Sequence, residues 1–174
     1  MHVKSGPARR QRRGIAALEL AIVSPFFAIV MVGMFELTRV MMVKEILDDA
    51  ARKGCRSGII PGHGTSYPTP SSSGSGIYQD VCNILNDNGL DPTKAVLTIT
   101  VAGSSASVYS ISGTYPNNSI SKSSGSGADP LTASSGTLVS VKVGMDFGDF
   151  AWTVTRVFVS GSTIESENVT MAKQ

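Results

Sequence analysis

The sequence contains one apolar run that is long enough to cross a lipid bilayer. From Ile15 to Phe35 the chain reads IAALELAIVSPFFAIVMVGMF, 21 residues with a single ionisable side chain, Glu19. A helix rises about 1.5 Å per residue, so the run covers roughly the 30 Å of a hydrocarbon core. We therefore predict a transmembrane helix over residues 15–36 that anchors the chain in a lipid bilayer.

The residues before this run predict its direction. They include five basic side chains and no acidic one: Lys4, Arg9, Arg10, Arg12 and Arg13. Basic flanks stay in the cytoplasm, so the four arginines act as an orientation signal that places everything after the span outside. Residues 15–174 keep only 10 basic against 13 acidic residues. The folded part is therefore not basic, which argues against nucleic acid as a partner.

Three alternatives to a membrane span fit the apolar run less well. A cleavable secretory signal has an apolar stretch of about 7–15 residues and a small-residue site after it, whereas this run is longer and continues into Phe35-Glu36-Leu37. A twin-arginine signal is a further alternative, but here four arginines are interrupted by Gln11. A buried core helix is seldom apolar on all sides over such a length.

The helical pattern continues beyond the membrane. Apolar residues recur every three or four positions and form one stripe: Leu37, Val40, Val43, Leu47, Ala50 and Ala51. Asp48 with Arg52, and Asp49 with Lys53, are acid-before-base pairs four residues apart. We predict one helix from Ile15 to Arg56, with an amphipathic part over 37–60; two helices broken near Gly33 are the alternative.

The remainder, residues 61–174, predicts an extracytoplasmic domain with Ser/Gly-rich loops. Gly62–Gly76 has the composition of a linker, and Gly103–Thr137 is mostly Ser, Gly, Thr and Asn. The expected elements are a helix over Ile77–Leu85 and strands over Ala95–Val101, Val108–Ile111, Leu138–Phe147, Val154–Val159 and Thr163–Met171. The fold class is α+β: a long helix, first transmembrane and then amphipathic, packed on a small antiparallel sheet.

The only two cysteines, Cys55 and Cys82, both follow the span. Thiols outside the cytoplasm tend to be oxidised, so we predict a disulfide between them, with two buried free thiols as the alternative. Two cysteines do not supply the four N/S ligands of a structural zinc site, and no metal or other cofactor is expected.

The chain offers little for catalysis. His63 stands alone in a Gly-rich turn, and a single exposed histidine is usually inert. Asp146 and Asp149 form a conceivable carboxylate pair, but loop carboxylates are usually solvated. We therefore do not expect an enzyme.

A carboxylate within an apolar span requires a physical cause. Glu19 is the fifth residue after Gly14. A cut after Gly14 would give Ile15 a free amine, and a neighbouring copy's amine would offer Glu19 a cation at the same depth. The alternative is a carboxylate that stays near the membrane surface, where its energetic cost is small.

These residues resemble the type IV prepilin pattern and, within it, the TadE-like minor pilins of the tight-adherence (Tad) pilus. The resemblance rests on Arg-Arg-Gly14-Ile-Ala-Ala-Leu-Glu19, on Pro25, on Glu36-Leu-Thr-Arg39 and on Ala50-Ala-Arg-Lys-Gly-Cys55-Arg. It is dense over about residues 12–60 and returns weakly at Val139–Phe147. Gly103–Thr137 matches no pattern of that family.

The resemblance implies a type IV pilin-like fold and a minor pilin, or pseudopilin, of the bacterial inner membrane. A prepilin peptidase would remove a leader, residues 1–14, by cutting between Gly14 and Ile15. Other pilin subunits and the pilus assembly platform would be its partners, with Glu19 as an assembly residue. Glu36 and Arg39 would dock subunits or, more simply, form an interfacial pair. The alternative function is an uncleaved single-pass surface protein whose outer domain binds a ligand or partner.

Overall fold

The computed structural model describes residues 8–60, 76–114, 118–150 and 161–174, with side chains from residue 14 onward. The chain divides into two compact units, Met1–Val40 and Met41–Gln174. The predicted linker with His63 and the predicted strand Val154–Val159 lie outside the described residues, apart from Gly76.

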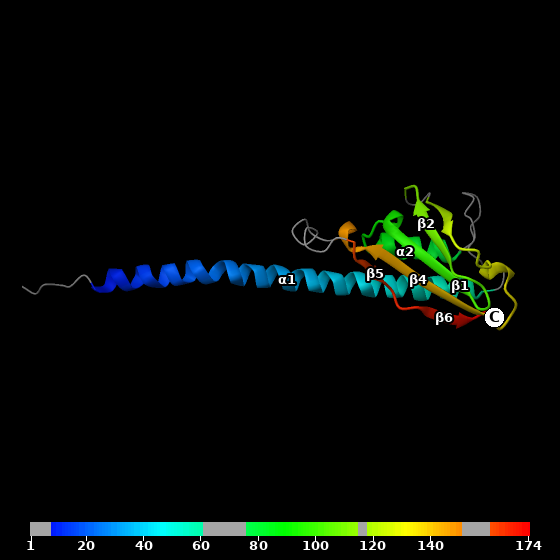
Figure 1. Ribbon diagram of the computed structural model, residues 1–174, viewed down its shortest axis with the longest axis horizontal. Helices are drawn as coiled ribbons and strands as arrows, with labels where there is room; N and C mark the ends of the chain where they lie inside the picture. Colours follow the sequence, from blue (N-terminus) through cyan, green and yellow to red (C-terminus); the bar gives the residue numbers. More distant parts are fainter. Residues whose placement is uncertain (1–7, 61–75, 115–117, 151–160) are drawn as a thin grey trace, which may run out of the picture. The chain divides into compact units, whose positions relative to one another are not determined.

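One long helix, α1, runs from Ala8 to Gly58 (Figure 1). It passes through Pro25 and through Gly33, so the alternative of two helices broken near Gly33 is wrong. The predicted single helix is confirmed and extends further at both ends. The α+β fold class is also confirmed, because an antiparallel sheet follows this helix.

The core of the second unit, Met41–Gln174, packs on the buried face of α1. Val43, Leu47, Ala50 and Ala51 are at most 4% exposed, as the apolar stripe predicts. The prediction fails for Leu37, which is 57% exposed. The stripe that contributes to the core therefore starts nearer Val43, one to two turns later than the sequence indicates.

The second helix, α2 (Ile77–Asp87), crosses α1 at small residues. A Cβ added to Gly54 would lie 2.9 Å from Cγ2 of Val81, and one added to Gly58 would lie 2.6 Å from Cδ1 of Ile77. Only glycine lets the two helices approach this closely, so Gly54 and Gly58 allow the crossing.

The sheet has six strands in the order β3-β2-β1-β4-β5, and β6 also pairs with β4. All pairings are antiparallel. The strands are β1 (Ala95–Val101), β2 (Ser107–Ser112), β3 (Ser119–Ser124), β4 (Leu138–Asp146), β5 (Thr163–Glu165) and β6 (Val169–Ala172). Short 3-10 helices are η1 (Pro92–Lys94), η2 (Pro130–Thr132) and η3 (Phe147–Asp149).

Alternation along the strands divides the sheet into two faces. The buried side chains of the central strands are Leu97, Ile99 and Val101 of β1 and Val139, Val141, Val143 and Met145 of β4. Cys55 of α1 donates from Sγ to the carbonyl oxygen of Val139 at 3.3 Å, so α1 packs against the face that these residues form. The period-two pattern predicted for residues 138–147 is therefore confirmed.

The opposite face of the sheet is rich in hydroxyl groups that bond across strands. Ser110 contacts Ser121 and Ser112 contacts Ser119, each at 3.0 Å between Oγ atoms. These pairs help serine-rich segments to form strands β2 and β3. The expectation of a single short strand within Gly103–Thr137 is therefore wrong, because serine pairing is not visible as a hydrophobic pattern.

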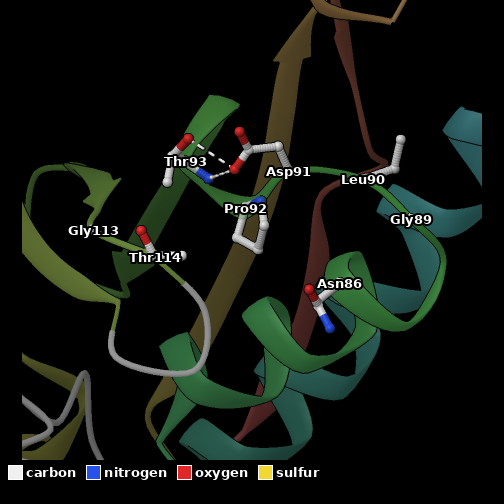
Figure 2. Close-up of a pocket in the computed structure, with 8 residues that line it drawn as sticks. All are labelled: Asn86, Gly89, Leu90, Asp91, Pro92, Thr93, Gly113 and Thr114. Atoms are coloured by element: carbon white, nitrogen blue, oxygen red, sulfur yellow. Dashed lines mark hydrogen bonds between the residues drawn. The ribbon is translucent and has the colours of Figure 1, made fainter.

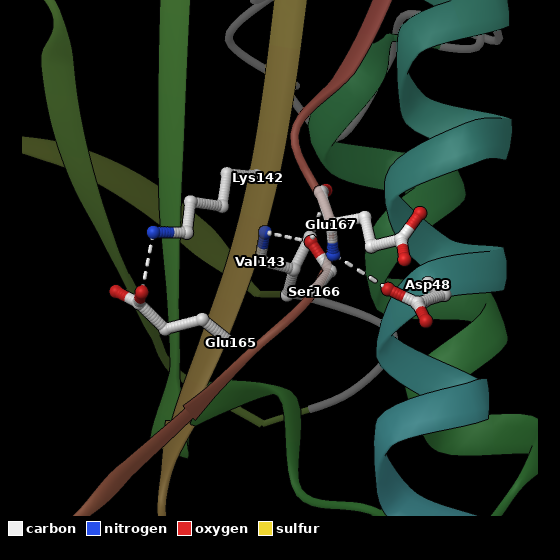
Figure 3. A network of polar contacts seen from close by, with 6 residues as sticks. All are labelled: Asp48, Lys142, Val143, Glu165, Ser166 and Glu167. Carbon is white, nitrogen blue, oxygen red and sulfur yellow. Dashed lines mark hydrogen bonds and ion pairs between the residues drawn. The ribbon is translucent and has the colours of Figure 1, made fainter.

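The C-terminal strand is interrupted between β5 and β6 (Figure 3). Ser166 accepts from the amide of Val143 through Oγ at 2.9 Å, and the amide of Glu167 donates to Oδ1 of Asp48 at 2.7 Å. Asp48 thus fixes the segment between β5 and β6 to α1. The predicted pair Asp48–Arg52 is not formed, and Asp49 contacts Arg52 at 4.0 Å instead of Lys53.

The last residues also bind to the domain. The amide of Gln174 donates to the carbonyl of Ile59 at 3.2 Å, which joins the end of β6 to the end of α1. Lys173 is buried, and its Nζ donates to the carbonyls of Pro130 and Leu131. These bonds satisfy the ammonium group with backbone oxygens and fix η2 against the C-terminal strand.

Gly54→Ala is expected to lower the free energy of unfolding of the full chain by about 1 kcal/mol. The new Cβ meets Val81 and Ile77, both β-branched and stiff, and overpacking costs about 1–3 kcal/mol. That exceeds the gain of about 1 kcal/mol in helix propensity. Denaturant unfolding in detergent, followed by near-ultraviolet circular dichroism, measures the change.

The matched control is Lys53→Ala, an exposed position in the same turn, which should leave stability nearly unchanged. A Gly54→Ala protein as stable as the unmodified chain would show that the helix crossing is not tightly packed.

Candidate membrane and assembly segment

The apolar part of α1 is not covered by the described chain. Ile15 is 60% exposed and Phe35 is 68% exposed, and the most apolar window of the helix has no buried residue. By length and composition this helix is able to cross a membrane. The alternative of a soluble core helix would require mostly buried side chains, so the exposure argues against it.

The predicted processing and assembly residues lie in the first turns of this exposed segment. Gly14 has no other atom within 4 Å of a Cβ built on it, and both Ile15 and Glu19 are exposed. Glu19 follows Ile15 by four residues, so the two lie on the same side of the helix. The four arginines of the orientation signal belong to α1 by their backbone: Arg9, Arg10, Arg12 and Arg13.

Glu36 and Arg39 differ in environment. Glu36 is 8% exposed, whereas Arg39, three residues later, is exposed. Carboxylates are rarely buried to this extent in folded proteins. The docking role that the resemblance implies for this pair stays a prediction.

Cys55 and Cys82 are both buried and present as free thiols. Burial raises the pKa of Cys55 to about 11 and that of Cys82 to about 12. Burial also raises the pKa of Tyr78, one turn before Cys82 on α2, well above its usual value. The neighbours Gly54 and Val81 bring the two helices into direct contact beside these cysteines. The disulfide between Cys55 and Cys82 is not formed here and stays a prediction.

An open pocket of about 470 Å³ lies at the end of α2 (Figure 2). Asn86, Leu90, Asp91, Pro92 and Thr93 line it on one side, and Gly113 and Thr114 after β2 on the other. Oδ1 of Asp91 already accepts from the amide of Thr93 at 2.9 Å and from its hydroxyl at 2.8 Å. The carboxylate therefore holds the turn into η1.

Sequence reasoning missed this pocket. Its lining comes from separate segments, and Asn88-Gly89 indicates only the end of a helix. The useful signal is Asp91-Pro92-Thr93, a turn sequence in which the aspartate accepts from the backbone two residues later. That sequence predicts the turn but not the pocket beside it.

The two carboxylates considered as a catalytic pair have separate local roles. Oδ1 of Asp146 accepts from the amide of Gly148 at 2.8 Å at the start of η3. Oδ1 of Asp149 lies 3.8 Å from Nζ of Lys94. Within the described residues no three His, Cys, Asp or Glu side chains gather in a manner that would hold a metal ion.

Residues 14–56 match the model of the TadE-like protein family. The match begins at Gly14, includes Glu19, Glu36 and Arg39, and ends one residue after Cys55. It confirms the TadE-like resemblance for most of α1 and does not extend to the sheet. No curated protein and no solved structure matches the chain.

We expect the protein with both thiols free to lose stability in alkali. Each thiol has a raised pKa when folded and an ordinary value near 9 when unfolded, so its contribution is fully present below pH 9. The contribution is lost as pH rises from 9 through the folded pKa, by about 2 kcal/mol per thiol at pH 10.5. Urea midpoints at pH 7.5, 9 and 10.5 measure the loss.

Cys55→Ala combined with Cys82→Ala is the control and should show a smaller alkaline loss than the parent. Alkylation of the unfolded, unreduced protein from membranes distinguishes the two oxidation states. Absence of free thiols would establish the disulfide predicted from the sequence, and the alkaline loss due to the thiols would then be absent.

Proposed function

We propose that this chain is a membrane-anchored minor pilin that takes part in the assembly of a Tad-type pilus after cleavage following Gly14. In this role it has a single membrane span in the bacterial inner membrane, with its N-terminus in the cytoplasm and residues 61–174 outside. The chain serves as a structural subunit rather than an enzyme.

One observation carries the proposal. The TadE-like match falls on an apolar helix whose surface is exposed from its first matched residue, Gly14. An exposed apolar surface of this length needs lipid or other helices around it. A pilin helix has both environments in turn: lipid before assembly and neighbouring subunits afterwards.

Cleavage gives Glu19 a role when the helix moves from lipid to contact with neighbouring subunits. Hydrolysis of the peptide bond leaves a carboxylate on Gly14 and a free amine on Ile15, both within the exposed first turns. The amine of one copy then pairs with Glu19 of another, which compensates the cost of a charge in an apolar environment. A prepilin peptidase, other pilin subunits and the assembly platform are the partners in this mechanism.

Gly14→Val is expected to prevent processing. A peptidase that accepts only glycine before the cut has no space for the branched side chain, so the leader remains attached. The measurement is the intact mass and N-terminal sequence of the protein from membranes of cells with and without a prepilin peptidase. The unmodified chain should start at Ile15 only when the peptidase is present.

An unmodified chain that keeps residues 1–14 in the presence of the peptidase would contradict the proposal. That result would favour the alternative, an uncleaved single-pass surface protein whose outer domain binds a ligand or partner.

Glu19→Ala should leave processing intact and reduce assembly. Removal of one member of a buried charge pair costs about 3 kcal/mol, so the yield of other pilin subunits co-purified with this chain should fall by about tenfold or more. Leu20→Ala, an exposed neighbour on the same helix, is the matched control. Equal losses in the two variants would show that Glu19 contributes only as part of the apolar surface.

A further inference from the structure

The pocket at the end of α2 is lined by polar groups that the fold itself does not use (Figure 2). Among the described residues, nothing bonds to the side-chain amide of Asn86 or to the hydroxyl of Thr114. Both bonds from Thr93 go to Oδ1 of Asp91, so Oδ2 of this carboxylate remains available. The pocket therefore has three unused polar groups, and they come from three separate segments of the chain.

The walls of the pocket are held in place before any ligand binds. Pro92 at the start of η1 is buried, and the two bonds from Thr93 fix the plane of the Asp91 carboxylate. On the other wall, Nδ2 of Asn118 donates to the carbonyl of Gly113 at 3.4 Å. Fixed walls reduce the entropy that is lost when a ligand binds, which is typical of small-molecule sites.

The lining excludes several classes of ligand. Among the described residues that form it there is no lysine, arginine or histidine, and Asp91 repels anions, so a phosphate or a carboxylate is not favoured. The same residues include no aromatic ring on which a flat base or ring would stack. One carboxylate supplies little of the charge and few of the six to eight oxygen ligands that a calcium ion takes. A neutral molecule with several hydroxyl groups is the class that remains.

A sugar ring matches the groups that are present. A carboxylate only accepts hydrogen bonds, whereas an amide and a hydroxyl both donate and accept, and neighbouring hydroxyls of a sugar do the same. The C–H groups of the ring match the apolar side chains of Leu90 and Pro92, which line the same pocket. Its volume of about 470 Å³ lies within the range of about 300–1,000 Å³ for small-molecule sites.

We propose that this pocket binds a neutral sugar residue, either free or at the end of a glycan. Oδ2 of Asp91 accepts from one hydroxyl of the ring, and the groups of Asn86 and Thr114 bond to its neighbours. Pro92 packs against the C–H groups. The pocket lies wholly within the second unit, so the inference depends neither on the membrane segment nor on the proposed function.

Saturation-transfer difference NMR tests the proposal on the full chain, purified in a phosphocholine detergent whose head group contains no sugar. The probes are the methyl glycosides of glucose, galactose, mannose and N-acetylglucosamine. We expect transfer to the ring protons of at least one of them, with a Kd of about 1–10 mM, because a ligand of this size makes few contacts. Absence of transfer to all four glycosides would overturn the proposal.

Substitutions in the lining locate the site. Asn86→Ala combined with Thr114→Val removes two of the three polar groups and should raise the Kd by about tenfold or more. Asp91→Asn keeps an acceptor for the amide of Thr93 but replaces the free carboxylate oxygen by a donor, so it should weaken binding with an unchanged urea midpoint.

Asp87→Ala is the matched control, because Asp87 is exposed on the same helix and does not line the pocket. It should bind as the parent chain does. A Kd that stays unchanged in the double variant, or that rises equally in the Asp87→Ala control, would contradict the site.

Two further probes identify the source and the charge of the ligand. A trisaccharide that binds more tightly than the methyl glycoside of its terminal residue would assign the pocket to a glycan, and equal affinities would assign it to a free sugar. Glucosamine carries an ammonium group. Binding of glucosamine without binding of any neutral glycoside would show that Asp91 selects a cation, which would reject a site for neutral sugars.

Discussion

The second unit, Met41–Gln174, depends on the close approach of α1 to α2 and β4. Gly54 and Gly58 leave room for Val81 and Ile77, and the Cys55 thiol bonds to the carbonyl of Val139. Burial along this face excludes water from both cysteines, so the thiols remain protonated well above their usual pKa. The same helix has an exposed apolar surface in its first part and a buried apolar face from Val43 onward.

Much of the fold follows from periodicity in the sequence. The single helix, α2, β1 and β4 are predicted because their apolar residues repeat at 3.6 or 2 positions and they are buried on one side. Strand β3 is not predicted because most of its residues are serines. They stabilise the strand through hydroxyl bonds to serines of β2, which leave no hydrophobic pattern in the sequence. The start of the buried stripe also escapes, since Leu37 and Val43 look alike in sequence and differ only in what packs on them.

The candidate sites divide in the same way. Gly14 and Glu19 are recognisable because arginines, a glycine and a carboxylate in an apolar run are conspicuous in one short segment. The TadE-like match begins at Gly14 and includes Glu19. The partner of Asp48 is not predictable in this manner. Its bond to Glu167 joins residues 119 positions apart, and a local rule assigns the carboxylate to Arg52 instead.

The interruption between β5 and β6 also changes the exposed edge of the sheet. A long regular edge strand would offer a row of free amides and carbonyls to any passing strand. Here Ser166 returns its hydroxyl to β4, and Asp48 takes the amide of Glu167, so the ladder at this edge is broken in its middle. Asp48 on α1 thereby removes one free amide from this edge, which leaves less for a passing strand to pair with.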